Sequence, residues 1–202
     1  MIGWCARQTL RLLGWRWQGE FPTCSKLVMI VAPHTSNWDL PMAMLFKWAL
    51  GVRVSYLAKH TLFWWPLGWF LRSTGAIPVR RDRHHDVVNQ VAQQFEQSSR
   101  LWLAIAPAGT RSKTDHWRSG FYHIVQAAGV PLVPVRLDFG PKELVFGVPH
   151  HVTGDVARDM DHLRAFFRGV RGLKHQHTSP VRLSSEVEPE RPPGSADEPE
   201  SS

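Results

Sequence analysis

Two kinds of segment alternate along the chain, and they differ in the spacing of their apolar positions. Short apolar runs bounded by turn residues predict strands, because they are too brief for helices. Longer segments repeat apolar residues at helical spacing, as Val87, Val91 and Phe95 do. The predicted strands cover 27–32, 52–58, 76–79, 101–106, 131–137 and 143–148, and the predicted helices cover 38–50, 84–98, 119–128 and 158–170. This alternation predicts an α/β domain with a mixed, largely parallel sheet flanked by helices.

The two ends of the chain differ from this domain, which we place at residues 25–174. Residues 1–24 begin with a basic amphipathic pattern that arginines interrupt, so it does not resemble a signal peptide. We expect a helix that docks in a membrane interface, and the alternative is a helix packed on the domain. Its apolar positions are Ile2, Ala6, Leu10, Leu13 and Trp17. Residues 175–202 turn to His, Ser, Pro and Glu and are predicted to form a disordered acidic tail.

Charge is distributed unevenly along the 202 residues. The formal net charge is +7, but residues 179–202 hold two arginines and six acids, so the rest of the chain carries +11. A basic body favours partners with phosphates: an anionic membrane surface, a phosphorylated small molecule or a nucleic acid. No apolar run reaches the roughly 20 residues that a transmembrane helix needs. With two cysteines and no disulfide framework, we expect a peripheral or monotopic protein on the cytoplasmic face of the cell membrane.

Tryptophan is concentrated in the first third of the chain, since eight of the ten precede residue 70. This side chain favours the membrane–water interface, where an apolar ring meets a polar edge. Trp38 and Trp48 fit an aromatic core and an interface equally well. The remaining six are expected to face a membrane: Trp4, Trp15, Trp17, Trp64, Trp65 and Trp69.

A polar stretch lies where the first predicted strand ends and a helix begins. Residues 31–39 read VAPHTSNWD and place His34 five positions before Asp39. Ligands bind at the carboxyl ends of strands in α/β sheets, and the helix dipole favours a carboxylate in the first turn of a helix. The spacing allows Asp39 to hold one imidazole nitrogen while the other takes a proton from a hydroxyl. A capping aspartate beside an ordinary loop histidine is the alternative.

Three further stretches follow this one in order. Residues 75–82 read GAIPVRRD, residues 105–114 read IAPAGTRSKT, and residues 129–135 read GVPLVPV. Together with the H-x4-D spacing of His34 and Asp39, they resemble the phosphate acyltransferase family typified by the 1-acylglycerol-3-phosphate acyltransferases. The resemblance covers about residues 25–150, and four motifs in order are far more specific than any one alone.

The resemblance implies a reaction and a role for each motif. His34 would be the general base on an acceptor hydroxyl, and Asp39 would orient it. The acyl chain would come from an acyl thioester of coenzyme A or acyl carrier protein, with no cofactor and no covalent enzyme intermediate. Arg81 and Arg111 would bind the phosphate of a 1-acylglycerol 3-phosphate acceptor. Gly109 and Thr110 belong to the same phosphate-binding motif, where glycine lets the backbone approach the ligand.

The third motif departs from the family pattern, because Ala108 stands where the family usually has glutamate. Loss of a charge-assisted partner costs roughly 1.5–3 kcal/mol where that bond was made. The alternative function is therefore a catalytically altered or inactive member that binds lipid or membrane.

Two other classes of ligand rank lower. Paired histidines occur without spaced carboxylate or cysteine partners, so we expect no metal site. These pairs are His84 and His85, His150 and His151, and His175 and His177. The aromatic residues cluster with apolar ones around Pro66 instead of alternating with Lys and Arg, so we expect no nucleic acid partner.

Overall fold

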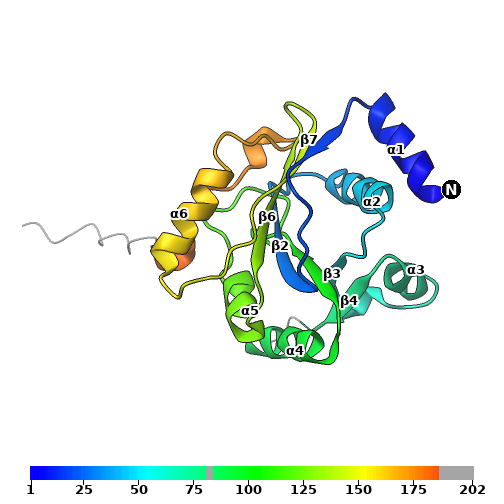
Figure 1. The fold of residues 1–202 in the computed structure, drawn as a ribbon. Helices are drawn as coiled ribbons and strands as arrows, with labels where there is room; N and C mark the ends of the chain where they lie inside the picture. The colour runs from blue at the N-terminus through cyan, green and yellow to red at the C-terminus, as the bar shows by residue number, and fades with distance from the viewer. Residues whose placement is uncertain (81–83, 187–202) are drawn as a thin grey trace, which may run out of the picture.

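A central sheet organises the molecule (Figure 1). The computed structural model describes residues 1–80 and 84–186, with the backbone alone for 84–86. Within these residues seven strands form one sheet in the order β1-β7-β6-β2-β5-β3-β4, and its neighbours are parallel except for β6 and β7. The strands are β1 (Arg16–Gln18), β2 (Lys26–Ala32), β3 (Ser55–Lys59), β4 (Ala76–Val79), β5 (Leu101–Ile105), β6 (Leu132–Asp138) and β7 (Glu143–Phe146).

Helices cover both faces of this sheet. Figure 1 shows α1 and α2 over one face and α4, α5 and α6 over the other. The helices are α1 (Ile2–Leu12), α2 (Asp39–Leu50), α3 (Leu67–Ser73), α4 (His84–Gln97), α5 (Gly120–Ala128) and α6 (Val156–Phe166), with short 3₁₀ turns at His60–Leu62, His175–His177 and Ser184–Glu186. The predicted mixed, largely parallel α/β architecture is confirmed.

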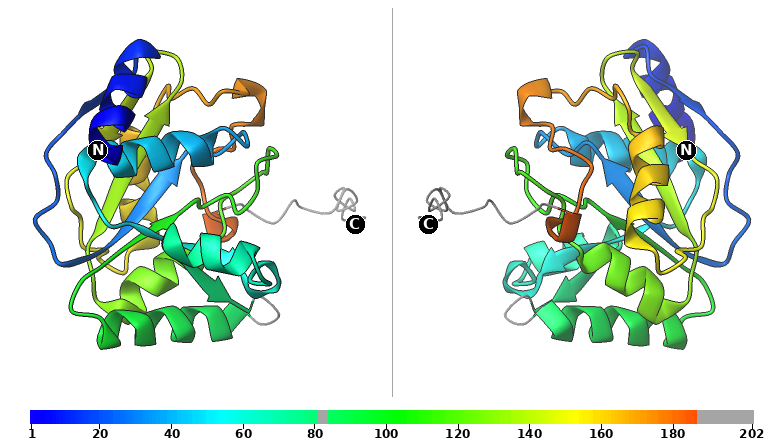
Figure 2. Two further views of the ribbon diagram at one scale, coloured as in Figure 1. Left: turned by 90° about the vertical axis from the view of Figure 1, so that its right-hand side faces the viewer. Right: turned by 90° about the vertical axis from the view of Figure 1, so that its left-hand side faces the viewer.

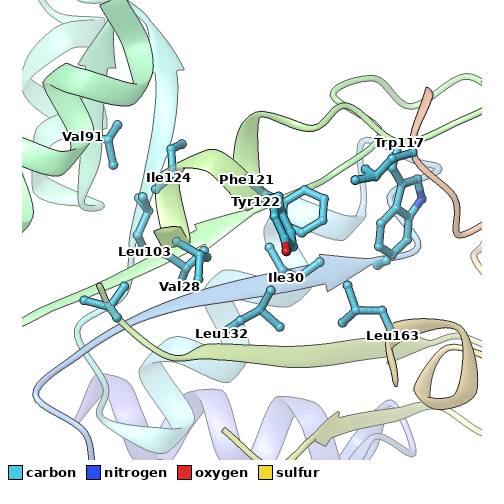
Figure 3. Packing of buried hydrophobic residues seen from close by; sticks show 14 of the residues in the cluster. Val28, Ile30, Val91, Leu103, Trp117, Phe121, Tyr122, Ile124, Leu132 and Leu163 are labelled. Atoms are coloured by element: carbon cyan, nitrogen blue, oxygen red, sulfur yellow. The ribbon is translucent and has the colours of Figure 1, made fainter. Parts of the chain in front are cut away.

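Strand β2 lies between β5 and β6, and its side chains contribute to the hydrophobic clusters on both faces of the sheet. Val28 and Ile30 point to the cluster under α4, α5 and α6, which Figure 3 shows, while Leu27 and Met29 join the cluster under α1 and α2. All four side chains are at most 4 % exposed. A strand buried on both faces reads as a continuous apolar run, and hydrogen bonds on both edges fix its carboxyl end in place.

The N-terminal segment is packed into this fold through part of its apolar face. Ala6 and Leu10 are buried in the cluster that contains α2, and Arg7 Nε donates to the Ala49 carbonyl at 2.7 Å. Strand β1 then pairs with β7 at the edge of the sheet. Ile2, Trp4, Leu12 and Leu13 remain exposed. The contacts of α1 therefore match the alternative in which the helix packs on the domain. The four exposed residues form a second apolar surface that these contacts leave uncovered.

Trp15 was expected at a membrane interface, and this prediction is wrong. Its side chain is 7 % exposed and packs edge-on against Phe46 and Phe139, with ring centroids 5.7 and 5.0 Å away. The cause is its place between α1 and β1. Because α1 packs on α2 and β1 joins the sheet edge, the residue that connects them is carried into the core.

The boundary of the predicted disordered tail is also wrong, because residues 175–186 pack on the domain. Leu183 is 2 % exposed, and the backbone N–H of Trp117 donates to the Arg182 carbonyl at 2.7 Å. Arg164 pairs with Glu186 at 2.9 Å. The physical reason is that apolar side chains within this polar segment, Val181 and Leu183, pack on the hydrophobic cluster under α5 and α6. Residues 187–202 lie outside the described residues.

This packing predicts that Leu183→Ala destabilises the protein. Truncating a buried leucine costs about 2–5 kcal/mol of unfolding free energy. The control is Leu173→Ala, since Leu173 is 46 % exposed, and we expect a change within about 1 kcal/mol. Urea denaturation of both variants measures this difference. Equal stability of the two variants would contradict the packed C-terminal segment.

Candidate active site

His34 and Asp39 meet at the junction between β2 and α2. His34 is the second residue after β2, and Asp39 is the first residue of α2. Their side chains lie 3.0 Å apart, from Nδ1 to Oδ2. The fixed end of the central strand and the start of a packed helix therefore hold the two groups together.

The Asp39 carboxylate organises the loop between them. Its Oδ2 accepts the backbone N–H groups of Thr35 at 2.7 Å and Ser36 at 2.9 Å, and it lies 3.0 Å from His34 Nδ1. The residue is 4 % exposed, and its Oδ1 has no partner among the described residues. Asp39 is not the cap of α2, because Trp38 holds the N-cap position and no side chain there makes a cap hydrogen bond. The Asp39 carboxylate therefore fixes the loop before the helix and lies against the histidine, as the dyad reading of the sequence predicts.

The His34 ring lines a small cavity at this end of the sheet. The Asp39 carboxylate 3.0 Å from Nδ1 favours a proton on that nitrogen, which leaves the Nε2 lone pair for another group. The side chain is 24 % exposed and borders a cavity of about 30 Å³. Its other lining residues are Ala32, Pro33, Pro107, Ala108, Trp117, Phe167, Val170, His177, Thr178, Ser179 and Val181. An imidazole held in one tautomer beside a mostly apolar cavity can take a proton from a hydroxyl.

The third motif follows β5, the neighbour of β2, and lies at the same end of the sheet. Gly109 has φ +68°, and a β-carbon there would meet the Arg118 side chain at 3.0 Å. Arg111 is exposed, and Thr110 Oγ1 accepts the Ser112 N–H at 3.3 Å. Ala108 is 8 % exposed and borders the same cavity as His34. The loop therefore brings Gly109, Thr110 and Arg111 to the dyad's edge of the sheet.

Arg118 is a residue that sequence reasoning missed. The Cδ and Nε atoms of its side chain lie over Gly109, and its backbone N–H donates to the Pro107 carbonyl at 3.0 Å. Its positive charge was the single signal in the sequence, and many exposed residues share that signal. The second-motif arginine, Arg81, lies outside the described residues, while Arg80 is exposed after β4.

Most exposed tryptophans belong to or adjoin α1, α2 and α3, and Figure 2 (left) shows these three helices on one side of the molecule. Trp64, Trp65 and Trp69 lie in and just before α3, and Trp4 lies on α1. Trp38 and Trp48, which fitted a core or an interface equally well, belong to the exposed group at 65 % and 42 %. The exposed set is Trp4, Trp17, Trp38, Trp48, Trp64, Trp65 and Trp69. No helix within residues 1–80 and 84–186 has the length and apolar character to cross a bilayer.

A second histidine–carboxylate pair lies at the opposite end of the sheet. His150 Nε2 is 3.0 Å from Asp159 Oδ1, and His150 pairs with Leu132, the first residue of β6. Burial raises the pKa of Asp159, but hydrogen bonds from Tyr122, His150 and Thr153 outweigh it and hold the pKa below its ordinary 3.8. These bonds tie α6 to its neighbours, so this pair is structural. In the part of the chain that is described, no cluster of three His, Cys, Asp or Glu side chains is positioned to hold a metal ion.

Comparison with known proteins identifies the family. The family model described as "Acyltransferase" matches residues 18–138, more than half of the chain. The chain belongs to the acyltransferase family. The resemblance seen in the sequence is therefore confirmed at the level of the family, and the matched region contains the dyad and the third-motif loop.

Individual relatives agree with this assignment. The 1-acyl-sn-glycerol-3-phosphate acyltransferase of Escherichia coli (strain K12) is 30 % identical over 112 residues, which are 52 % of this chain and 44 % of the relative. The enzyme of the same name from Streptococcus pneumoniae is 29 % identical over 126 residues, 62 % of this chain and 46 % of the relative. The chain thus spans less than half the length of these curated relatives.

A solved structure shares the fold. The crystal structure of the 1-acyl-sn-glycerophosphate (LPA) acyltransferase PlsC from Thermotoga maritima has a TM-score of 0.53 and covers 82 % of this chain and 73 % of its own. Sequence identity is 16 %, so this likeness supports the acyltransferase architecture alone.

The geometry predicts unequal effects of the two dyad residues on stability. Asp39→Ala leaves the N–H groups of Thr35 and Ser36 buried without an acceptor, which costs about 1–3 kcal/mol of unfolding free energy. His34→Ala removes a partly exposed ring, so we expect a change within about 1 kcal/mol. Urea denaturation compares the two variants, and equal losses would contradict the role of Asp39 in holding the loop.

Proposed function

We propose that this acyltransferase-family protein transfers an acyl chain from an acyl thioester to a hydroxyl of 1-acylglycerol 3-phosphate. The observation that carries the proposal is the His34–Asp39 pair at 3.0 Å, held at the end of β2 beside a cavity. The names of the relatives support the choice of acceptor. Coenzyme A or acyl carrier protein would carry the thioester, and the reaction would need no cofactor.

In this mechanism His34 acts as the general base. The acceptor hydroxyl gives its proton to Nε2 while its oxygen attacks the thioester carbonyl carbon. The tetrahedral intermediate then collapses, the carbon–sulfur bond breaks, and the leaving thiolate takes the proton from the imidazolium. The products are an ester and a thiol. Asp39 stays ionised throughout and stabilises the imidazolium through Nδ1.

The third-motif loop would bind the acceptor phosphate. Arg111 and Arg118 supply guanidinium groups, which match the geometry of phosphate oxygens. Gly109 leaves room for the Arg118 side chain to lie over this turn, and Thr110 adds a hydroxyl donor. Arg81 is assigned to the same phosphate because its motif resembles the second motif of the family.

The acceptor would reach this site from a membrane surface. The helices α1, α2 and α3, which carry or adjoin most of the exposed tryptophans, lie on one side of the molecule, and Trp38 directly precedes Asp39. Tryptophan rings at an interface and basic side chains near anionic headgroups both favour docking. We place this docking on the cytoplasmic face of the cell membrane, where acyl thioesters of coenzyme A are supplied.

His34→Ala is expected to lower kcat/KM for acyl transfer by about 10²–10⁴-fold, the usual contribution of a general base. The assay follows acyl transfer from acyl-CoA and from acyl carrier protein to 1-acylglycerol 3-phosphate in vesicles. His123→Ala is the matched control, because His123 is exposed on α5. Full activity of His34→Ala would refute the mechanism.

Ala108 supports the second candidate, an altered member of the family that binds lipid without turnover. Ala108→Glu restores a carboxylate beside the cavity, and a charge-assisted bond there is worth about 1.5–3 kcal/mol, or roughly ten- to a hundredfold in kcat/KM. Turnover and vesicle flotation are measured for both proteins. Wild-type turnover supports the enzyme. Vesicle binding without wild-type turnover, with turnover gained in Ala108→Glu, supports the alternative.

A further inference from the structure

The C-terminal segment after α6 crosses the end of the sheet that holds the dyad. We call residues 171–183 the strap (orange in Figure 2). Its Lys174 N–H donates to Thr35 Oγ1 at 3.3 Å, and a β-carbon at Gly172 would collide with the same threonine side chain. Thr35 is 2 % exposed and is itself bound to Asp39. The strap therefore rests directly on the loop between His34 and Asp39.

The strap also binds the third-motif loop. Ser179 Oγ accepts from the Thr114 N–H at 2.9 Å and lies 2.9 Å from Thr114 Oγ1. His177 Nδ1 lies 3.2 Å from the Arg111 carbonyl oxygen. Since β2 and β5 are neighbours, these contacts close the strap over the space between the two loops.

One edge of the His177 ring is left available by this arrangement. A carbonyl oxygen only accepts, so Nδ1–H is the donor and Nε2 is the second, separate position on the ring. Among the hydrogen bonds of the described residues, none uses His177 Nε2. His177 borders the same cavity as His34 and Ala108. The strap thus brings a second imidazole to the active site, beside the position where the motif lacks its carboxylate.

The two segments that meet at His177 are both basic. The strap contains Arg171, Lys174 and Arg182 and no acid. The loop of residues 109–118 contains Arg111, Lys113 and Arg118 with Asp115 as its one acid. None of these Lys and Arg side chains lines the cavity itself, but they lie on the two segments that flank it. Positive charge on both flanking segments favours an anion, and a phosphate monoester is the anion that the proposed acceptor carries.

We propose that His177 is a phosphate-binding residue of the acceptor site, so that the strap supplies one half of that site and the third-motif loop the other. The proposal rests on the proposed function. With phosphate bound, Nδ1–H donates to the Arg111 carbonyl, and Nε2–H of the imidazolium donates to a phosphate oxygen. The cavity that His177 shares with His34 has a volume of about 30 Å³.

The test uses His177→Asn, because an asparagine amide can keep the bond to the Arg111 carbonyl but has no group at the Nε2 position. His175→Asn is the matched control on the same turn, since His175 is exposed. Acyl transfer is measured on 1-acylglycerol 3-phosphate and on monoacylglycerol, which lacks the phosphate. We expect His177→Asn to raise the KM for the phosphate-bearing acceptor about tenfold, the value of one charge-assisted hydrogen bond. The kcat and the KM for monoacylglycerol should stay within about twofold.

Two results of this assay would overturn the proposal. An equal change for both acceptors, or none, would assign His177 a purely structural role. A rise confined to the KM of the acyl donor would place a phosphate of the donor, not of the acceptor, at His177.

A binding measurement separates failure of this proposal from failure of the proposed function. Histidine ring NMR signals of the wild-type protein are followed while glycerol 3-phosphate is added. A shift of the His177 Nε2 signal that is absent with glycerol supports the phosphate site even where no turnover is found. An unchanged His177 signal at saturating glycerol 3-phosphate would overturn it.

Discussion

The Asp39 carboxylate oxygen that accepts two backbone N–H groups is the constraint on which the site depends. The Thr35 and Ser36 backbone donors bind this one atom, and His34 Nδ1 lies 3.0 Å from it. The same atom therefore closes the loop after β2 and holds the histidine beside it. Because β2 is hydrogen-bonded on both edges, the loop starts from a fixed point, and the dyad is assembled before any ligand arrives.

The site has one rigid wall and one wall made by chain that returns from far along the sequence. The dyad and the third-motif loop follow neighbouring strands of the sheet. The opposite wall is the strap, which is held by a few hydrogen bonds to Thr35, Arg111 and Thr114 and by the burial of Leu183. In the proposed reaction the first wall supplies the general base, and the second wall supplies His177. Arg111 contributes to both walls, since its backbone carbonyl contacts His177 of the strap and its side chain is exposed.

Local pattern was enough to predict most of the fold, because the main strands are apolar on both faces and the main helices keep a regular apolar stripe. Strand β4 lies at 76–79 as predicted, and α2 begins within one residue of its predicted start. Strand β1 was missed because its three side chains are all exposed, so its pairing with β7 leaves no apolar signal. Helix α3 was missed because it has seven residues and follows a proline.

The site was predictable where function follows from adjacency to a strand end, as for His34, Asp39 and Gly109. It was not predictable where contacts join distant parts of the chain. Nothing near Arg118 indicated that its side chain would lie over Gly109, and nothing in residues 175–186 indicated a partner for Leu183. Trp15 shows the same limit, because its place beside a basic helix favoured an interface, and only the pairing of the next strand, β1, with β7 carries it into the core.

Helix α2 sets the distance between the dyad and the first helix. Asp39 is its first residue, and near its other end the Ala49 carbonyl is held by Arg7 of α1. Its twelve residues span about 18 Å. In the proposed docking of α1 on a membrane, α2 would therefore hold His34 at a fixed distance from the anchoring point. The helix would then act as a ruler between that point and the reacting hydroxyl.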